Sequence, residues 1–469
     1  MRETRGRFGL APWVWTLAAC AFGALALGFC CPGPAGASDW PQWGGPQRNG
    51  TVSSALPPAG DLGLVELWRR PAPEGISALV VTGDSLLTLG MADGLPHAWA
   101  FDAGTGEARW RAPIPAFEGG QEYGTATTPA TDGETLFLVS PGCHLLALQT
   151  TSGSVRWSRD LVEDFATGPM PLGCWTSPLL AGNLVVVQVN GQPDAQLVAF
   201  SKQSGEVVWK TGGLARATHS SPGLGLLGGV EQVLVLGVEK GLGALQGISL
   251  ECGELLWRHD FEQPDSYSAD MPLILFEGRV AAIGWNDVRA VDVTPPDGPG
   301  GRWSTELAWV SDSLNAALLP VNLHAVAVDG DLAGFDQELL VWIDGEDGRR
   351  LWSVCIYAGS LIAVDGRLVI LSQAAGALRI AEASSRGYGE LLSDAVFTPG
   401  APTDTPPSYA GGRLYLRNSE EIVALEIRPS ASSRTPDDLK NGESKNGEPK
   451  GEGQTERNSQ TERKPDGES

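Results

Sequence analysis

The residues best suited to chemistry lie in short polar segments, each just before a proline that opens an apolar stretch. Aromatic rings stand there beside hydroxyl, imidazole and carboxyl groups, a combination that suits binding of a polymer, a peptide or a sugar. The segments contain Glu122–Tyr123, Cys174–Trp175, His219, Ser266–Ser268, Asp270, Asn315 and Asp404. From them we select a candidate interaction surface made of Tyr123, Trp175, His219, Tyr267 and Asp270. The alternative is that these side chains only cap a channel.

Signals for metal binding and catalysis are weak. The histidines fall at different phases of the repeat described below, so they do not predict a metal centre. They are His97, His144, His219, His259 and His324. Asp344–Gly348 resembles a Ca²⁺ loop only faintly, because it also fits the turn of the repeat. The sequence has no Gly-x-Ser-x-Gly elbow, His-Glu-x-x-His motif or phosphate loop. We therefore predict no catalytic residue, no bound metal and no cofactor.

The N-terminus has the three parts of a secretory signal peptide. Three arginines precede an uncharged run from Phe8 to Ser38, which ends in Ala35-Gly36-Ala37. We predict cleavage after Ala37, so that residues 1–37 direct export to the periplasm or cell envelope of a bacterium. Two alternatives stay open. The run is long enough to remain as a membrane anchor, and Leu17–Cys20 resembles a lipoprotein box.

Charge and cysteine content narrow the function classes. The net charge of −23 argues against nucleic acid as a partner, because no basic face is available to displace phosphate counterions. Three of the seven cysteines, Cys20, Cys30 and Cys31, lie in the leader. The others have no zinc-site spacing, and they are Cys143, Cys174, Cys252 and Cys355. Cys143 and Cys174 could form a disulfide if the loops that carry them meet. We expect unpaired buried thiols instead.

A repeat organises most of the exported chain. Its unaltered copy, Ala100-x-Asp102-x-x-Thr105-Gly106-x-x-x-Trp110, reads as the end of one strand, a tight turn and the start of the next. An insertion at 295–301 moves the tryptophan of the fifth copy to Trp309, and the seventh copy has Leu391 instead. Further copies begin at Ala147, Ala199, Gly247, Ala290, Trp342, Ala381 and Ala424.

The period of this repeat predicts the fold. Ala100 to Ala147 spans 47 residues and Ala381 to Ala424 spans 43, which leaves room for four short strands per copy. No helical pattern lies between them, so the sequence predicts an all-β propeller of four-stranded antiparallel blades. The eighth copy stops near Ile427, whereas Leu64–Arg69 matches its missing strand. We therefore expect eight blades, the last closed by strands from both termini. Seven blades are the alternative if the seventh copy forms none.

The repeated tryptophans and turn glycines are predicted to be structural. Burying an indole removes about 150–250 Å² from water, so rings at one place in successive blades would wedge neighbouring sheets together. The tryptophans are Trp68, Trp110, Trp157, Trp209, Trp257, Trp309 and Trp352. The turn glycines are Gly106, Gly153, Gly205, Gly253, Gly348 and Gly387.

Composition divides the chain into four parts. A signal peptide (1–37) is followed by an arm rich in Trp, Pro and Gly (38–62), in which Trp40 and Trp43 are expected to dock on the body. The propeller covers 63–429. From 430 to 469 the polar sequence cannot bury enough apolar surface to order itself, so we expect a solvated tail.

The unit at Ala100–Trp110 resembles the tryptophan-docking repeat of the pyrroloquinoline-quinone (PQQ) dehydrogenase propellers. The propeller lipoprotein of the outer-membrane β-barrel assembly machine shares this repeat, and the resemblance covers about Gly63–Ile427. The dehydrogenases it resembles bind the quinone with Ca²⁺ beneath a vicinal disulfide, but the adjacent cysteines here, Cys30 and Cys31, fall in the leader. The resemblance therefore favours the assembly-factor branch, which works as a docking surface.

Three functions follow as hypotheses. The preferred one is an exported, non-enzymatic propeller, expected to be a monomer, that binds another envelope protein or polymer as an interaction or assembly scaffold. In this hypothesis the chain meets the membrane only through an uncleaved or lipidated N-terminus. The alternatives are an oxidoreductase that uses PQQ with Ca²⁺ and a carbohydrate-binding propeller.

Overall fold

The computed structural model describes most of the region between the predicted leader and tail. The described residues are 39–58, 60, 62–117, 125–167, 174–192, 194–216, 220–239, 241–262, 272–284, 287–298, 300–312, 325–400, 403 and 405–429. The predicted signal peptide, the predicted tail and Tyr123, His219, Tyr267 and Asp270 lie outside them. None of the helices in the described ranges has the length and apolar character needed to span a bilayer.

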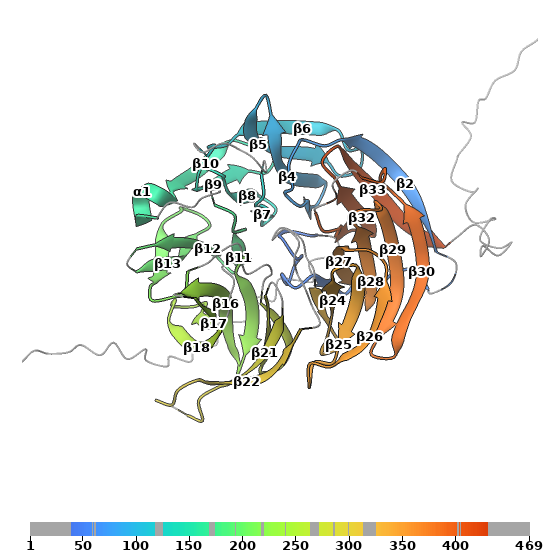
Figure 1. Ribbon diagram of the computed structural model, residues 1–469. Coiled ribbons are helices and arrows are strands. Elements are labelled where there is room, and N and C mark those ends of the chain that lie inside the picture. Colours follow the sequence, from blue (N-terminus) through green and yellow to red (C-terminus); the bar gives the residue numbers. More distant parts are fainter. Residues whose placement is uncertain are drawn as a thin grey trace, which may run out of the picture. The chain divides into compact units, whose positions relative to one another are not determined.

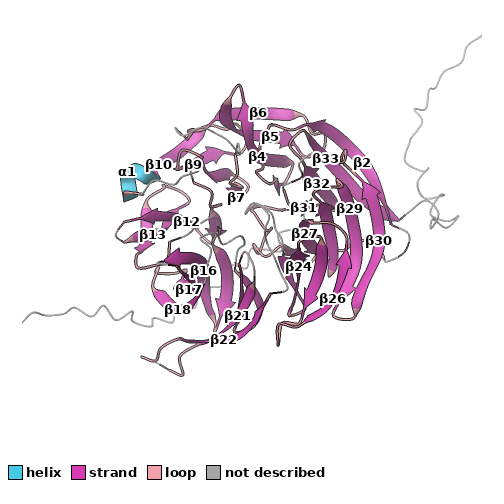
Figure 2. Cartoon of the chain, in the orientation of Figure 1, coloured by secondary structure: helices cyan, strands magenta, loops and turns pink. Residues whose placement is uncertain are grey.

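Eight sheets follow one another around a ring, and each runs from an inner first strand to an outer fourth strand (Figures 1 and 2). Successive strands within a blade pair antiparallel. The prediction of an eight-bladed propeller with four-stranded antiparallel blades is therefore confirmed. The seven-blade alternative is wrong, because the degenerate seventh copy forms a full blade.

The strand bounds follow the repeat. Blades 1 and 2 contain β3 (Val80–Thr82), β4 (Ser85–Ala92), β5 (Leu95–Asp102), β6 (Ala108–Pro113), β7 (Ala130–Thr131), β8 (Thr135–Val139), β9 (His144–Gln149) and β10 (Val155–Asp160). Blades 3 and 4 contain β11 (Leu179–Ala181), β12 (Leu184–Gly191), β13 (Ala195–Ser201), β14 (Val207–Thr211), β15 (Gly223–Leu227), β16 (Val230–Glu239), β17 (Leu242–Ser249) and β18 (Leu255–Glu262). Blades 5 and 6 contain β19 (Leu273–Phe276), β20 (Arg279–Ile283), β21 (Val288–Thr294), β22 (Ser304–Ser311), β23 (Ala325–Val328), β24 (Asp331–Asp336), β25 (Leu339–Ile343) and β26 (Arg350–Cys355). Blades 7 and 8 contain β27 (Gly359–Val364), β28 (Arg367–Ser372), β29 (Ala377–Ser384), β30 (Gly387–Ala395), β31 (Ser408–Ala410), β32 (Arg413–Arg417), β33 (Glu421–Pro429) and β2 (Leu62–Pro71).

Both ends of the propeller segment build blade 8. Its outer strand β2 pairs antiparallel with β33, and Trp68 faces Ala424 in that ladder. The predicted closure by strands from both termini is therefore confirmed. In addition, β1 (Thr51–Val52) joins blade 7 as a fifth strand, parallel to the inner strand β27. A two-residue strand has too little periodicity to be recognised from sequence.

The middle strands of each blade are buried on both faces. In β8, for example, all five residues from Thr135 to Val139 are buried, because neighbouring blades cover both sides of the sheet. The outer strand β6 instead alternates between exposed and half-buried residues. This difference explains why the middle strands are continuous apolar runs in the sequence.

The register of the outer hairpin is the structural signature of the repeat. Ala100 pairs with Trp110, and a bulge lies between this pair and the turn. The small residue opposite the indole leaves room for the ring. Blade 7 differs: Ala381 pairs with Glu390, so Leu391 occupies the bulge, and only two residues separate β29 from β30. The seventh copy has thus lost both the tryptophan and the standard turn.

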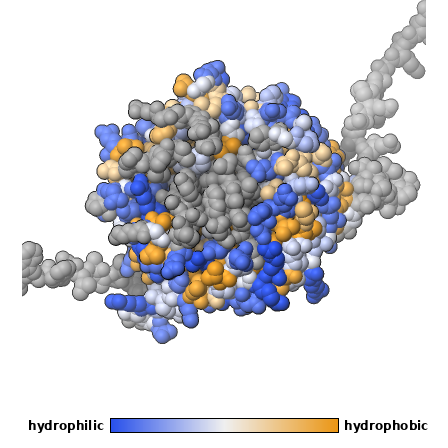
Figure 3. Space-filling model, in the orientation of Figure 1, coloured by the Kyte–Doolittle hydropathy of each residue, from blue (hydrophilic) through white to orange (hydrophobic). Residues whose placement is uncertain are grey.

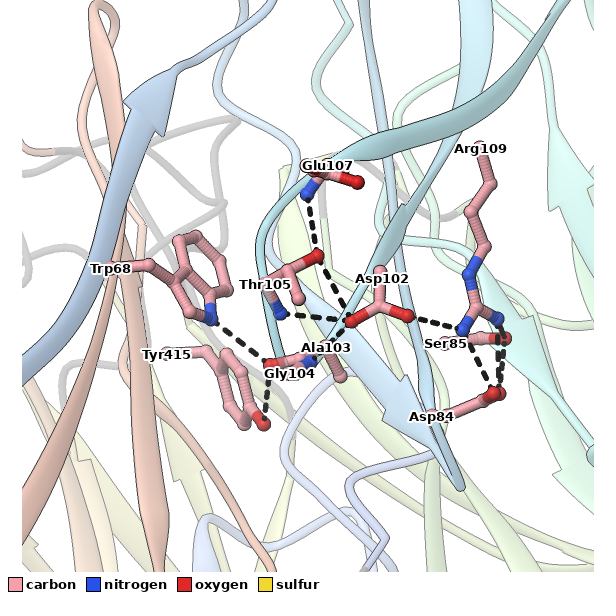
Figure 4. Close-up of polar contacts among 10 residues, drawn as sticks. All are labelled: Trp68, Asp84, Ser85, Asp102, Ala103, Gly104, Thr105, Glu107, Arg109 and Tyr415. Carbon is pink, nitrogen blue, oxygen red and sulfur yellow. Dashed lines mark hydrogen bonds and ion pairs between the residues drawn. The ribbon is translucent and has the colours of Figure 1, made fainter. Parts of the chain in front are cut away.

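Figure 4 shows the docking unit where blade 8 meets blade 1. Trp68 Nε1 donates to Ala103 O at 3.1 Å, and the Tyr415 hydroxyl donates to the same oxygen at 3.3 Å. Asp102 Oδ1 holds the turn by accepting from the backbone N–H of Gly104 and from Thr105. Its other oxygen accepts from Arg109 at 2.6 Å, which holds the pKa of the Asp102 carboxyl below its usual value.

The same contact recurs at six junctions between blades. Each indole N–H donates to a backbone carbonyl in the turn of the next blade. The pairs are Trp68 with Ala103, Trp110 with Thr150, Trp157 with Lys202, Trp209 with Leu250, Trp309 with Gly345 and Trp352 with Ser384, at 2.7–3.1 Å. At five of these junctions, a Cβ on the turn glycine would come within 2.4–2.6 Å of the indole. These glycines are Gly106, Gly153, Gly205, Gly253 and Gly348.

Trp257 and Gly387 depart from the pattern. Trp257 Nε1 donates to Gln232 Oε1 at 2.7 Å within its own blade. At the junction of blades 4 and 5, Pro295 and Trp303 instead cover the turn at Gly228, where a Cβ would lie 2.6 Å from Pro295. A Cβ on Gly387 would have no neighbour within 4 Å, because blade 7 lacks the standard turn.

Replacing Gly153 by Ala tests the indole contact. A Cβ there would lie 2.6 Å from Trp110, on top of the strain of φ +70°. Gly213→Ala is the matched control, because Gly213 has the same φ of +70° and no atom within 4 Å of a Cβ. We expect Gly153→Ala to lower the free energy of unfolding by about 1–3 kcal/mol more than the control, measured by urea denaturation. Equal losses in the two variants would contradict a close-packed indole.

Candidate functional site

A belt of hydroxyl groups joins the first four blades where their inner strands begin. The backbone N–H of Ala78 donates to Thr128 Oγ1 at 3.2 Å, that of Thr128 to Ser177 Oγ at 3.0 Å, and that of Ser177 to Ser221 Oγ at 3.0 Å. Thr128, Ser177 and Ser221 each precede a proline, which supplies no N–H of its own. The residue before each proline therefore links its blade to the next around the axis.

The arm crosses the centre of the ring. In Figure 1 it is the blue segment that lies inside the inner strands. Trp40 exchanges two backbone hydrogen bonds with Val81 of β3, and the backbone N–H of Thr131 donates to Pro41 O at 2.8 Å. On the far side, the N–H of Ala363 donates to Gly50 O at 2.8 Å. The arm is thus bonded to the inner strands of blades 1, 2 and 7, near the ends of those strands.

Arg48 holds the arm on the axis. Its side chain is buried, and its guanidinium donates to Pro222 O at 2.6 Å, Pro178 O at 2.7 Å and Ser177 O at 2.8 Å. Trp43 lies beneath the guanidinium, 5.8 Å from ring centroid to Cζ, and is itself buried. Burial lowers the pKa of Arg48 to about 9, which still leaves it charged at neutral pH. The cation is therefore stabilised by backbone dipoles of blades 3 and 4.

Arg417 has a similar place in the closing blade. Its buried guanidinium donates to Pro73 O at 2.6 Å, Gly75 O at 2.8 Å and Ser77 O at 3.1 Å. These carbonyls lie in the segment between β2 and β3, so Arg417 ties blade 8 to the entry of blade 1. Burial lowers the pKa of Arg417 to about 10.

Of the candidate interaction surface, only Trp175 falls within the described residues. It is 8% exposed and packs with Ala126 and Ile76, on the segments that precede the inner strands. Its ring therefore presents little surface to a partner. Whether Tyr123, His219, Tyr267 and Asp270 come together with it stays a prediction.

The expectation of unpaired thiols at Cys143 and Cys174 is wrong. The two form a disulfide with Cα atoms 5.2 Å apart. Cys143 ends the β8–β9 turn of blade 2, where its carbonyl also accepts from the N–H of Leu161, the first residue of α1 (Leu161–Phe165). Cys174 opens blade 3, so adjacent blades bring the residues together across 31 positions. Cys252 and Cys355 are free, as expected, but exposed rather than buried.

The described residues do not fit the quinone site of the dehydrogenases that the repeat resembles. That site lies beneath a disulfide of adjacent cysteines, whereas Cys143 and Cys174 are separated by 31 residues. No group of three His, Cys, Asp or Glu residues suited to a metal ion occurs in the part of the chain that the structure describes.

The described part of the face drawn in Figure 3 carries its apolar side chains in several places. In Figure 3, orange hydrophobic groups form separate small patches among blue hydrophilic ones. The exposed large apolar side chains are likewise spread over several blades, as in Leu95, Val155, Leu226 and Val310. Scattered apolar residues of this kind are normal on a soluble surface.

Comparison with known proteins places the chain in a family. The family model described as outer membrane protein assembly factor BamB matches residues 65–170 and 96–354, which together span more than half of the chain. The protein is thus a propeller of the PQQ-like repeat class, and it belongs to this BamB-like family. No curated protein matches the chain.

Solved structures show the same fold at low sequence identity. BamB from Moraxella catarrhalis is 14% identical with a TM-score of 0.53, and the match covers 78% of this chain and 98% of that one. The quinohemoprotein alcohol dehydrogenase from Comamonas testosteroni is 12% identical with a TM-score of 0.59, covering 83% of this chain and 80% of that one. A protein named as an assembly factor and an alcohol dehydrogenase thus share this fold.

Replacing Arg48 by Met tests whether the arm is part of the folded core. The change leaves three buried carbonyls without their donor, at about 1–3 kcal/mol for each unsatisfied group. We expect the free energy of unfolding to fall by about 3 kcal/mol or more in urea denaturation. The matched control is Arg349→Met, because Arg349 is 67% exposed and should change stability by less than about 0.5 kcal/mol. Equal small effects would show that the arm is peripheral.

Removing the disulfide should also destabilise the fold. Cross-linking residues 31 apart stabilises by about 3–4 kcal/mol through the unfolded chain. We expect a Cys143→Ser, Cys174→Ser variant to unfold at a lower temperature than the wild type, and a reducing agent to lower the melting temperature of the wild type but not of this variant. A Cys252→Ser, Cys355→Ser variant serves as the control. A wild type insensitive to reduction would contradict the cross-link.

Proposed function

We propose that the chain is an exported, non-enzymatic propeller that acts as a protein-interaction or envelope-assembly scaffold. Membership of a family described as an outer membrane assembly factor supports a docking role. The Cys143–Cys174 disulfide supports an oxidising compartment outside the cytoplasm, in agreement with the predicted signal peptide. A monomer that binds another envelope protein or polymer is the simplest form of this function.

The observation that carries the proposal is the arm on the axis. Arg48 donates to carbonyls of blades 3 and 4, and Trp43 is buried beside it, so the chain itself occupies the centre of the ring. This packing favours recognition on the outer surfaces and rims over chemistry inside the ring. The segments that precede the inner strands remain the preferred surface, and in blades 3 and 4 Arg48 bonds their carbonyls at Ser177, Pro178 and Pro222.

Affinity capture from the native envelope tests the scaffold. The wild type is compared with a variant in which Tyr123, His219 and Tyr267 are changed to Ala, and partners are identified by mass spectrometry; Trp175 is left unchanged because it is buried. We expect the wild type to recover a defined partner and the variant to lose it, because the side chains that would contact the partner are gone. Equal recovery would remove the rim from the proposal, and a wild type that recovers nothing would contradict the scaffold itself.

Adding PQQ with Ca²⁺ to purified protein provides the control for the enzymatic alternative. We expect no absorbance change and no thermal shift, because the described residues do not match the dehydrogenase site. A saturable shift would favour the oxidoreductase.

A further inference from the structure

The junction between blades 4 and 5 is joined at its outer edge by polar contacts instead of the usual indole contact. Trp257 has the place of the docking ring in blade 4, but its Nε1 donates to Gln232 of the same blade at 2.7 Å. The outer strands β18 and β22 lie beside each other here (Figure 1). Deeper in the junction, Ile274 of blade 5 packs so closely on Gly225 of blade 4 that a Cβ there would collide with it. The inner part of the junction is thus packed independently of the two outer strands.

Three side chains of β18 face blade 5. Side chains alternate along a strand, so Trp257, His259 and Phe261 point to the same side, where Trp257 packs with residues of blade 5. The imidazole of His259 is half-buried, and its Nδ1 lies 3.2 Å from the Thr305 hydroxyl of β22. That hydroxyl is also 3.5 Å from Arg258 O. His259 and Thr305 thus form a direct hydrogen bond between the two outer strands.

A guanidinium of blade 5 lies on the same face. Arg289 of β21 stacks over Phe261, with Cζ 4.8 Å from the ring centroid, and its side chain is only 15% exposed. Its carboxylate partner is Asp287, at 2.7 Å. Burial lowers the pKa of His259 below its usual value, Asp260 partly offsets this shift, and Arg289 adds to it. A protonated imidazole therefore adds a second cation between the two blades.

The other charged groups on the strands around His259 point elsewhere in the described structure. Arg258 and Asp260 lie on the opposite face of β18 and pair with each other at 2.7 Å. Glu306 follows Thr305 on β22 and so faces the other side, and β17, which pairs with β18, has no titratable side chain. Protonation reverses the hydrogen bond without removing it, since the Thr305 hydroxyl can turn to Arg258 O and accept from Nδ1. The cost of protonation is therefore electrostatic.

We propose that the outer edge of this junction is an acid-sensitive contact, at which β18 and β22 separate in mildly acidic solution while the ring stays closed. At neutral pH the imidazole is uncharged and the contact is stable. As the pH falls below about 6.5, the pKa of an exposed histidine, the separated state takes up a proton more readily than the closed state. The stability of the contact is thus lost as the pH falls toward the lower pKa of the closed state. The contact needs no partner, so the proposal does not depend on the scaffold function.

Hydrogen–deuterium exchange at about pH 7.5 and about pH 5 tests the contact, after correction for the intrinsic pH dependence of exchange. We expect the protection of backbone amides in β18 and β22 to fall at least about threefold more than that in β14 and β26, the outer strands of blades 3 and 6. His259→Asn keeps a side chain that can hydrogen-bond Thr305 but cannot be protonated, so it should remove this difference. His144→Asn is the matched control, because His144 is also half-buried and also bonds through Nδ1, but in blade 2. It should behave as the wild type does.

Three results would overturn the proposal. The first is an equal loss of protection in all four outer strands of the wild type, and the second is an undiminished loss in β18 and β22 of His259→Asn. The third is a pKa of about 6.5 or higher for His259, measured by NMR titration of the wild type. This titration needs no substitution, so it decides the question if His259→Asn misfolds. A matching loss of protection in the inner strands would contradict a local opening, because the whole ring would then be separating.

Discussion

A four-stranded sheet with two apolar faces cannot be stable alone, so each blade depends on the neighbours that cover it. The indole-to-carbonyl contact is the local form of this dependence. At six junctions it combines a ring packed against the next blade with a hydrogen bond from the indole N–H, which is buried at Trp68, Trp209 and Trp309. Because the acceptor is a backbone carbonyl, its position is fixed by the turn rather than by a flexible side chain. The turn glycine is required for a related reason, since any Cβ would collide with the ring.

The inside of the ring follows a second rule, which concerns polar groups rather than apolar faces. Inner strands converge on the axis, where their unpaired carbonyls have no further strand to bond. Arg48 and Arg417 supply several donors each at such places, and within the described ranges neither forms an ion pair with a carboxylate. Oriented peptide dipoles balance the charge of both arginines. Each arginine can therefore be buried only when the blades that supply those carbonyls are assembled in the ring. In the same way, the hydroxyl groups of the belt from Thr128 to Ser221 accept hydrogen bonds from backbone N–H groups near the axis.

The sequence predicts the parts of this structure that are local and repeated. The turn at Ala100–Trp110 encodes its own strand, bulge and ring within eleven positions, so copies of it reveal the blades and their number. The role of Arg48 could not be predicted, because a single arginine in a nonperiodic arm gives no sign of the carbonyls it meets. The Cys143–Cys174 disulfide was missed for a similar reason: a spacing of 31 means nothing until two blades are placed side by side. The sequence signal for the belt is a hydroxyl residue before the proline that precedes an inner strand, as at Thr128, Ser177 and Ser221.

Closing a ring from a linear chain leaves one place where the repeat must fail. If the closing blade takes strands from both ends, its outer hairpin has no turn, and the preceding blade has nothing on which to dock an indole. Leu391 is consistent with this geometry, because a large ring at that position would lie against no partner turn. The short β29–β30 hairpin and the passage of Ser53–Pro58 through the junction are further consequences. The arm fills this gap only in part, and the two hollows beside it are lined by backbone and by charged side chains of both signs. In a protein built from repeated units, the chain topology alone thus determines where the surface departs from the regular pattern.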